Sequence, residues 1–412
     1  MENVSSSNGL EKYPKLRFPG FDEPIKSAHL SQYLVENKER NKNLIYTKSD
    51  VLSVSGEYGI VNQIEFQGRS FAGESVAEYH VVETNDIVYT KSPLKANPYG
   101  IIKVNKGVPG IVSTLYAVYH PCEGTVAEYI DYYFGNDLRL NKYLKPLVNI
   151  GAKHDMKVNN ETILTGEVYF PSYSEQKKIV DFLTILDERI RQQRNLVEAL
   201  KKYKRGVIQH IFRSSHTLIK RSQWQQVRLG DIFKKVSRRN TNGKIKNVIT
   251  NSAEYGLIPQ RDFFDKDIAV DGNTSNYYVI EEGDFVYNPR KSNNAPFGPF
   301  NRYTLSEQGI ISPLYTCLVL QANINPSYLA WYFKSDAWHR YIYDNGSQGV
   351  RHDRVSMTDN LLMGIPVIYP ERKIQDSIAN TLDLIESRLH LAQNKLDLLN
   401  IERNGFMQQL FI

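Results

Sequence analysis

The chain has 412 residues, which is more than one ordinary domain needs and suits two or three. Its composition is globular, with 41% hydrophobic and 23% charged residues, and no stretch approaches the roughly 20 apolar residues of a membrane span. The net charge of +6 allows a polyanionic partner but does not by itself indicate one. Two cysteines, Cys122 and Cys317, offer no disulfide framework, and the first residues lack the apolar core of a signal peptide, so we expect a cytoplasmic protein.

Along the chain, short segments of the first half return in the second half. Five of them recur in the same order: Glu57–Ile60 as Glu254–Leu257, Asn85–Tyr89 as Gly283–Tyr287, Asn97–Gly100 as Ala295–Gly298, Gly110–Ser113 as Gly309–Ser312, and Lys153–Asp155 as Arg351–Asp353. The distance between matching segments stays between 197 and 199 residues, which chance does not produce five times in order. A period of this length is domain-sized, so the sequence predicts a tandem duplication.

Each copy begins with short apolar runs separated by turn signals. In the first copy these runs include Asp86–Tyr89 and Gly110–Tyr119, with Gly and Asn frequent between them. This pattern is typical of strands and loops with a few short helices.

A long helix follows in each copy. Ser174–Phe212 contains no Pro and a single Gly, and Ser174 is its predicted N-cap. Apolar residues recur at alternating spacings of four and three, which is the pattern of a heptad seam. Its members are Ile179, Leu183, Leu186, Ile190, Val197 and Leu200 in the first copy, and Ile378, Leu382, Ile385, Leu389, Leu396 and Leu399 in the second. Lys204 and Arg403 interrupt the seam at matching places.

Two helices of equal length and phase can satisfy each other's seam. We therefore predict an α+β fold in which two globular modules are separated by two long antiparallel coiled-coil helices, each roughly 55–60 Å long. The predicted boundaries are 1–171 for the first module, 172–213 for the first long helix, 214–370 for the second module and 371–412 for the second long helix. The alternative is that each helix covers only its own module, although such a helix is normally shorter and has a period of about 3.6.

Three segments resemble the specificity (S) subunits of type I restriction-modification enzymes. Pro171–Ile190 and Leu200–Phe212 are similar to their central conserved region, and Leu16–Phe21 resembles the start of many such subunits. In the second copy, Gly405–Phe411 keeps the pattern, while Pro370–Gln375 departs from Pro-x-x-x-Glu-Gln. The resemblance covers nearly the whole chain, and the repeat plan is more specific than any single motif.

The resemblance implies that residues 1–171 and 214–370 are target-recognition domains, each of which reads one half of a bipartite double-stranded DNA target. It also implies that the long helices dock two modification (methyltransferase) subunits, which restriction (motor-nuclease) subunits join. The chain itself would be non-catalytic and hold no cofactor, since S-adenosylmethionine, ATP and Mg would be bound by the partner subunits. Two other hypotheses stay open: the recognition part of a single-chain DNA methyltransferase-nuclease, and a coiled-coil adaptor that binds no DNA.

Loops rich in hydrogen-bond donors occupy matching places in the two copies. Arg and Lys recognise guanine or phosphate, and Asn recognises adenine. The expected DNA-binding residues are Lys91, Ser92, Lys95, Asn97, Lys153, His154 and Lys157 in the first copy, and Arg290, Lys291, Ser292, Asn293, Arg351, His352 and Arg354 in the second. A solvated polar loop is the alternative for each segment, and a structural His-Asp hydrogen bond is the alternative for the two histidines.

Motifs of catalysis are missing from the sequence. It contains no Gly-x-x-x-x-Gly-Lys-Ser/Thr phosphate loop and no Cys-x-x-Cys or His-Glu-x-x-His metal set. Asn97–Gly100 lacks the second proline of an amino-methyltransferase motif, and Ala295–Gly298 lacks the Asn, so both are interpreted as turns. Glu371–Lys373 imitates the end of a nuclease motif, but its counterpart in the first copy does not align with it.

Overall fold

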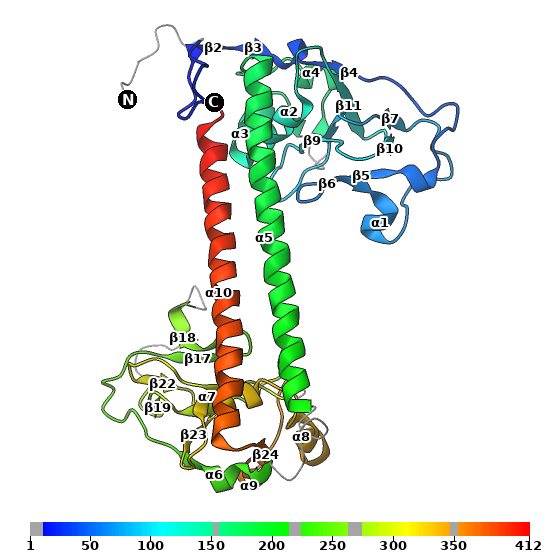
Figure 1. Ribbon diagram of the computed structural model, residues 1–412. Helices are drawn as coiled ribbons and strands as arrows, with labels where there is room; N and C mark the ends of the chain where they lie inside the picture. Colours follow the sequence, from blue (N-terminus) through cyan, green and yellow to red (C-terminus); the bar gives the residue numbers. More distant parts are fainter. Residues whose placement is uncertain (1–10, 151–155, 214–223, 263–273, 347–352) are drawn as a thin grey trace. The chain divides into compact units, whose positions relative to one another are not determined.

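The computed structural model (Figure 1) describes residues 11–150, 156–213, 224–262, 274–346 and 353–412. It divides into two compact units: unit 1 comprises Met1–Gln193 with Lys395–Ile412, and unit 2 comprises Arg194–Asn394. The boundaries fall inside two long helices, α5 (Tyr173–Arg213) and α10 (Arg372–Gln409). Each unit therefore contains the start of one long helix and the end of the other. None of the helices in these ranges combines the length and apolarity that a membrane span requires.

Unit 1 is built around a four-stranded antiparallel sheet in the order β4-β11-β8-β9, with two-stranded pairs beside it. Its strands are β1 (Glu11–Lys12), β2 (Ile25–Lys26), β3 (Ala28–His29), β4 (Leu34–Glu36), β5 (Leu52–Ser55), β6 (Gly59–Asn62), β7 (His80–Val82), β8 (Ile87–Thr90), β9 (Ile102–Val104), β10 (Gly110–Val112), β11 (Tyr116–Pro121), β12 (Asn149–Ile150), β13 (Met156–Lys157) and β14 (Glu167–Val168). Its short helices are η1 (Leu30–Gln32), η2 (Lys48–Asp50), α1 (Gln63–Gln67), α2 (Ala127–Phe134), α3 (Asp137–Leu144) and α4 (Asn160–Ile163).

Unit 2 repeats this plan around a sheet in the order β16-β23-β20-β21. Its strands are β15 (Gln225–Arg228), β16 (Phe233–Val236), β17 (Ile249–Ser252), β18 (Gly256–Pro259), β19 (Tyr278–Ile280), β20 (Phe285–Tyr287), β21 (Phe300–Arg302), β22 (Gly309–Ile311), β23 (Thr316–Leu320) and β24 (Pro366–Tyr369). Its short helices are α6 (Leu229–Ile232), η5 (Gln260–Asp262), α7 (Pro326–Phe333), α8 (His339–Asn345) and α9 (Asp359–Met363). The pairs β19-β22, β17-β18 and β15-β24 match β7-β10, β5-β6 and β3-β14, so the duplication in sequence is also a duplication in structure.

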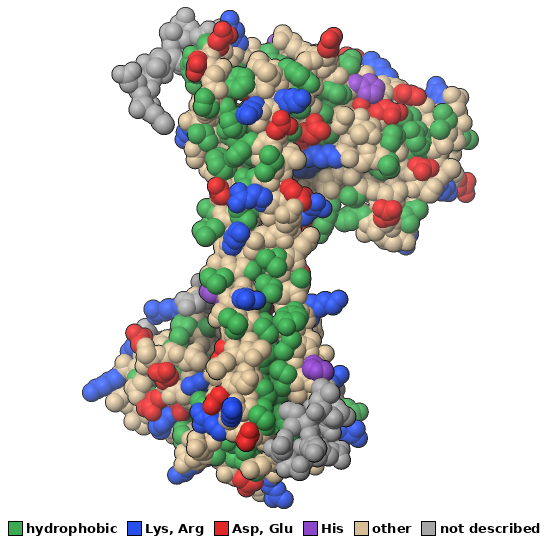
Figure 2. Space-filling model, viewed as in Figure 1, with side chains coloured by type: hydrophobic (Ala, Val, Ile, Leu, Met, Phe, Trp, Pro, Cys, Tyr) green, Lys and Arg blue, Asp and Glu red, His purple; other side chains and the backbone are tan. Residues whose placement is uncertain are grey.

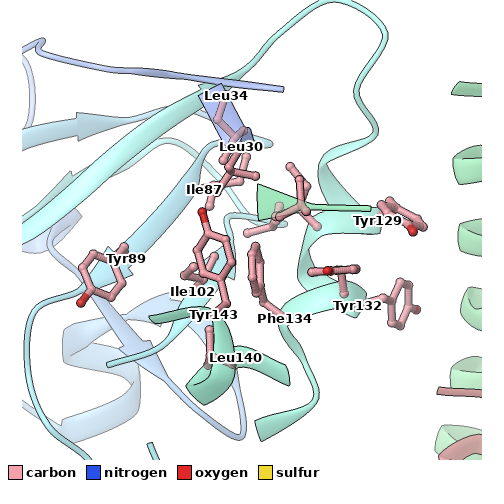
Figure 3. Close-up of a cluster of buried hydrophobic side chains, with 14 of the residues drawn as sticks. Leu30, Leu34, Ile87, Tyr89, Ile102, Tyr129, Tyr132, Phe134, Leu140 and Tyr143 are labelled. Carbon is pink, nitrogen blue, oxygen red and sulfur yellow. The ribbon is translucent and has the colours of Figure 1, made fainter. Parts of the chain in front are cut away.

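Figure 3 shows the core of unit 1, where the sheet meets α2 and α3. Ile87 and Ile102 of the sheet belong to one buried cluster with Phe134 and Tyr143 of the helices. The Tyr143 hydroxyl donates to the carbonyl of Ile163 at 2.5 Å, so this buried polar atom is satisfied. Each such side chain contributes about 1.5–3 kcal/mol to stability by leaving water.

The repeated Asp-Ile/Phe-Val-Tyr motif begins the central buried strand of each unit. The Asp86 carboxylate accepts a hydrogen bond from the Glu83 N–H at 2.8 Å, and Asp284 accepts one from the Glu281 N–H at 2.9 Å. Burial raises the pKa of both carboxyl groups, and these backbone donors act in the opposite direction. The motif is therefore part of the scaffold, because its aspartate closes the turn that leads into the strand.

The Pro-Tyr/Phe-Gly segments are turns, as the sequence predicts. Gly100 has φ +90°, and a Cβ atom there would lie 2.0 Å from the carbonyl oxygen of Thr90. Gly298 has φ +84°, and a Cβ atom would lie 2.0 Å from the carbonyl oxygen of Asn288. Both positions therefore require glycine.

The two long helices pack against each other in an antiparallel sense. In unit 1, the ring centroids of Phe182 and Phe406 are 4.9 Å apart, and Asp187 pairs with Arg403, so residue numbers rise along α5 as they fall along α10. Because α5 begins at Tyr173, the predicted N-cap Ser174 lies inside its first turn instead of before it.

Burial along the helices has the period of the seam. The buried members are Ile179, Leu183, Leu186, Ile190 and Val197 on α5 and Leu382, Ile385, Leu396 and Leu399 on α10, and the half-buried members are Leu200, Ile378 and Leu389. Near the end of α5 the buried residues are Ile208 and Phe212, one position later than the heptad spacing gives. The shift arises because these residues join the core of unit 2, which includes α7.

The interruption of the seam has a structural reason. In unit 1, Arg403 Nε lies 2.5 Å from Asp187 Oδ1, and in unit 2, Lys204 Nζ lies 2.6 Å from Glu386 Oε2. The two ion pairs are related by the duplication, since their bases and their acids are each 199 residues apart. A charge pair in an apolar seam favours one register over others, at some expense of stability.

An aromatic residue fixes the end of each long helix. In unit 1, the ring of Phe411, just beyond α10, lies 5.3 and 6.2 Å from two tyrosine rings of α2. In unit 2, the ring of Phe212 in the last turn of α5 lies 5.7 and 5.6 Å from two tyrosine rings of α7. Each unit is therefore completed by the end of a helix that begins in the other.

A buried glutamine fixes the start of each long helix. Gln176 accepts a hydrogen bond from a backbone N–H at 3.0 Å and donates to the carbonyl of Pro171 at 2.9 Å. Gln375 makes the same two bonds at 2.8 Å each, the second of them to Pro370. The second copy thus keeps the glutamine of the Pro-x-x-x-Glu-Gln pattern and departs from it at Ile374, which replaces the glutamate.

Candidate DNA interface

The donor-rich loop of unit 2 leaves β20 from a fixed base. The side-chain amide of the buried Asn288 donates to the carbonyl of Asn251 at 3.3 Å, and its oxygen accepts from the N–H of Arg290 at 3.0 Å. A tight turn follows, in which the N–H of Ser292 donates to the carbonyl of Ala295 at 3.0 Å. The predicted residues that this turn exposes to solvent are Arg290, Ser292 and Asn293.

A second predicted segment lies beside this loop although it is distant in sequence. The N–H of Lys291 donates to the carbonyl of Asp353 at 2.9 Å, and Arg290 and Arg354 are antiparallel bridge partners. The structure therefore joins two segments that were predicted separately into one surface. Lys291 and Arg354 are half-buried in it.

The Arg354 guanidinium has hydrogen-bonding capacity left over. Its Nη2 lies 3.3 Å from Asp353 Oδ2, and this contact holds the pKa of the Asp353 carboxyl below its usual range. Its Nε is buried and has no hydrogen-bond partner among the described residues. Burial raises the pKa of Tyr315, and the positive charge of Arg290 acts in the opposite direction, which indicates that Arg290 lies near this tyrosine. Guanidinium donors at such an exposed edge suit a phosphate or the edge of a guanine.

The corresponding loop of unit 1 follows β8 and exposes different side chains. Lys91 and Ser92 are half-buried at its start, and burial lowers the pKa of Lys91, which Glu36 partly opposes. Leu94 and Asn97 then exchange two backbone hydrogen bonds of 3.0 and 3.1 Å, which form a tight turn. Lys95 is exposed within that turn and is the clearest candidate for a phosphate or base contact in this loop.

Asn97, unlike the exposed Lys95 of the same loop, is turned into the protein. Its side chain is buried, with 7% of the residue exposed, and its amide donates to Asp137 Oδ1 at the start of α3 at 2.9 Å. We therefore interpret Asn97 as an anchor of the loop, in contrast to its prediction as a DNA-binding residue.

The remaining predicted residues are not part of the described structure. Lys153, His154, Arg351 and His352 lie outside the described residues, as does the side chain of Lys157. The backbone of Lys157 belongs to β13 and pairs with Asn149 of β12.

Two arginines that the sequence comparison passed over occupy matching places. Arg40 is a bridge partner of His80 in unit 1, and Arg239 is a bridge partner of Tyr278 in unit 2. The positive charge of Arg40 lowers the pKa of Lys91, which indicates that Arg40 lies near the candidate loop. The signal that marks them is an Arg-Asn dipeptide repeated 199 residues apart, whose asparagine is buried in both units.

The described residues show neither a cluster of metal ligands nor an activated thiol at Cys317. No group of three or more His, Cys, Asp or Glu side chains within them is placed to hold a metal ion. Burial raises the pKa of the Cys317 thiol to about 12, which is the opposite of what a nucleophile needs. On the face drawn in Figure 2, Lys and Arg side chains are interspersed with Asp and Glu side chains, so charge alone does not mark a binding face.

Two solved structures have a similar fold along nearly the whole chain. The crystal structure of the type I restriction-modification system S subunit from M. genitalium matches with a TM-score of 0.54 at 14% identity, over 97% of this chain and 99% of that chain. A chain from a structure on complex assembly and conformational transition of the type I R-M system matches with a TM-score of 0.53 at 16% identity, over 96% of this chain and 98% of that chain. No protein-family model and no curated protein matches the sequence. The chain therefore has the fold of the type I restriction-modification S subunits.

Proposed function

We propose that this chain is the sequence-specific DNA-recognition subunit of a type I restriction-modification complex. Each unit reads one half of a bipartite double-stranded target through its donor-rich loops, and the chain performs no catalysis. The fold and the chemistry of the loops support this proposal together.

The observation that carries the proposal is one scaffold built twice with different loops. The buried aspartates, the glycine turns and the glutamines that start the long helices are the same in both units. The exposed loop after β8 presents Lys95, whereas the loop after β20 presents Arg290 and Asn293. Arg and Lys pair with guanine and Asn with adenine, so two such readers suit a target with two different halves.

The partners in this proposal are two modification subunits, which bind S-adenosylmethionine, and restriction subunits, which use ATP and Mg. Exposed apolar side chains on the long helices support docking, because soluble chains rarely leave such surfaces uncovered. They are Tyr173, Ile185, Leu196 and Tyr203 on α5 and Leu384, Leu391, Leu398 and Ile401 on α10, and each is between 48% and 67% exposed.

A map of methylated adenines in the host genome tests the proposal, with the gene for this chain intact and deleted. We expect one split motif to lose methylation on deletion. Exchange of residues 1–171 for those of another S subunit should then change one half of that motif and leave the other half intact. If no split motif loses methylation on deletion, the proposal is contradicted and an adaptor that binds no DNA is favoured. Methyl transfer by the isolated chain would favour the single-chain methyltransferase-nuclease.

Loop variants assign each half of the motif to a unit. Arg290→Ala should weaken DNA binding by the assembled complex by about 1–3 kcal/mol and relax one half only, because a bidentate base contact is worth that much. Lys95→Ala should act on the other half, and if it contacts phosphate it should lower the slope of affinity against salt by about 1. Arg340→Ala, at a residue of α8 whose side chain is 90% exposed, is the matched control, because it also removes one positive charge. If each loop variant weakens recognition of both halves of the target equally, the hypothesis that each unit reads one half is wrong.

A further inference from the structure

Most of the residues that the two copies share have a structural role in both units. Beyond the buried aspartates and the turn glycines, Gly110 and Gly309 are required because a Cβ atom would lie 2.6 Å from Asp50 O and 2.4 Å from Ile249 Cγ1. The hydroxyls of Ser113 and Ser312 close the turn before β11 and β23, since they accept N–H donors at 3.4 and 3.3 Å. The scaffold therefore explains why these residues recur.

Three repeated side chains remain largely exposed to solvent in both units. In unit 1 they are Glu57 and Tyr58 at the tip of the β5-β6 hairpin and Leu115 in the turn before β11, and we call them the unit 1 tips. In unit 2 they are Glu254, Tyr255 and Leu314, the unit 2 tips. The tyrosines are 60% and 61% exposed and the leucines 65% and 57%, while both glutamates are also exposed. The Tyr58 ring lies 5.4 Å from the ring of Phe66, yet more than half of each tyrosine and of each leucine stays exposed at the same place in both copies.

Each set of tips forms one surface. Val51, just before β5, and Ile111 of β10 are parallel bridge partners, and so are Val248 and Ile310 in unit 2. The two bridged segments of each unit therefore run in the same direction, and the turns that follow them emerge at the same end. In unit 1, Tyr116, which follows Leu115, lines a common groove of about 550 Å³ with Gly56, which precedes Glu57, so the two turns lie at the edge of one groove.

The chemistry of the tips suits a protein partner better than DNA. A carboxylate repels phosphate, and an exposed leucine and tyrosine gain free energy when another apolar surface covers them. The groove of unit 1 extends this apolar character, because Phe66, Phe71 and Leu94 line it and are 45%, 57% and 43% exposed. The DNA-facing loops differ between the units, whereas the tips are the same, so the partner of the tips must be the same at both units.

We infer that the unit 1 tips and the unit 2 tips are two equivalent docking sites for two copies of one protein, which offers an apolar contact and a basic side chain. On the proposed function, on which this inference rests, the protein present in two copies is the modification subunit. Its contact with the chain then extends from the long helices onto the β-domains.

Native mass spectrometry of the full chain, co-expressed with the methyltransferase subunit of its own host and kept free of DNA, tests the inference. The unit 1 variant combines Glu57→Lys, Tyr58→Ala and Leu115→Ala, and the unit 2 variant combines Glu254→Lys, Tyr255→Ala and Leu314→Ala. We expect each variant to bind one of its two methyltransferase subunits at least about tenfold more weakly, as loss of an interface anchor does. The combined variant should weaken both.

Control variants alter exposed residues that are not repeated. Glu123→Lys with Leu138→Ala matches the charge change and the loss of apolar surface in unit 1, and Tyr343→Ala, at a residue 70% exposed, serves unit 2. Both controls should keep the full number of methyltransferase subunits, and all variants should keep the unfolding midpoint of the parent chain.

Each other outcome has a distinct meaning. Unchanged assembly with DNA binding at least about tenfold weaker would mean that the tips contact DNA, and the inference would be wrong. Unchanged assembly and unchanged DNA binding would also overturn it. If the parent chain itself binds no methyltransferase subunit, the docking role in the proposed function fails first, and the inference fails with it.

Discussion

Unit 1 and unit 2 give the same buried aspartate different partners. In unit 1, Asp86 Oδ1 lies 2.5 Å from Nδ1 of His120, whereas in unit 2, Asp284 pairs with Arg238. A histidine is charged only when it is protonated, and an arginine always is. The difference teaches that the duplication has kept the geometry of the scaffold while its electrostatics changed.

A second histidine extends the contrast. His80 of β7 is buried, with 2% of the residue exposed, at the place where unit 2 has the half-buried Tyr278. Burial lowers the pKa of His80 to about 4, and the charges of Arg40 and Lys91 act in the same direction, while Glu36 opposes them. The segment around β7 in unit 1 is therefore expected to respond to acid, whereas its counterpart around Tyr278 in unit 2 is not. Unit 2 has a half-buried histidine elsewhere, His339, whose pKa is also lowered by burial.

The largest expected effect comes from the aromatic residues that fix the helix ends. Phe212→Ala and Phe411→Ala should each destabilise one unit by about 3–4 kcal/mol, since each removes a buried ring from a packed cluster. All three tryptophans, Trp224, Trp331 and Trp338, lie in unit 2, so tryptophan fluorescence during urea unfolding reports on that unit. Phe212→Ala should lower the fluorescence midpoint, whereas Phe411→Ala should instead speed hydrogen exchange in β8 and β11. The reverse assignment would contradict the conclusion that each unit is completed by the end of the long helix that begins in the other unit.

An intermediate effect is expected from pH. Because the pKa of His80 is lower in the folded state than its unfolded value of about 6.5, its contribution to stability is full above that pH and is lost as the pH falls toward 4. The loss in unit 1 at pH 5 should be about 1–2 kcal/mol, and His80→Gln should remove it. Hydrogen exchange of β7 and β10 at pH 5 and pH 7.5 measures this change. An equal acid response of the His80→Gln variant and the parent chain would disprove it.

The smallest expected effect concerns the ion pairs of the helix seam. Asp187→Ala should cost unit 1 about 1 kcal/mol, because Asp187 pairs with Arg403 and also accepts a hydrogen bond of 2.9 Å from the Tyr132 hydroxyl. Glu386→Ala should cost unit 2 only about 0.5 kcal/mol, since its pair with Lys204 is partly exposed. Hydrogen exchange along α5 and α10 compares the two variants. A larger loss from Glu386→Ala would show that the hydroxyl contact does not stabilise unit 1.

The regular elements could be predicted because their signals are periodic. The heptad spacing of residues such as Leu183 and Leu382 predicts two long helices, and these helices pack together as expected. The interruption at Lys204 and Arg403 is visible in the sequence, but its cause is not. Each base meets an acid of the other helix, and only the three-dimensional pairing reveals which one.

The candidate site was less predictable, since it depends on contacts between distant segments. Arg290 and Arg354 are bridge partners although they are 64 residues apart in the sequence, and no local sequence pattern predicts such a pairing. The burial of Asn97 is equally hidden, because its partner Asp137 lies on another element. Composition therefore identifies which loops carry donors, and packing decides which donors remain exposed.

Each unit consists of a β-sheet module, the start of one long helix and the end of the other, and this composition has a consequence for biosynthesis. Leu410 and Phe411 belong to the core of unit 1, although unit 1 begins at the N-terminal end of the chain. A ribosome makes the whole of unit 2, which is continuous from Arg194 to Asn394, before it reaches these residues. The first unit to be synthesised is thus the last that can complete its core, and its tyrosine-rich surface on α2 stays uncovered until Leu410 and Phe411 have been made.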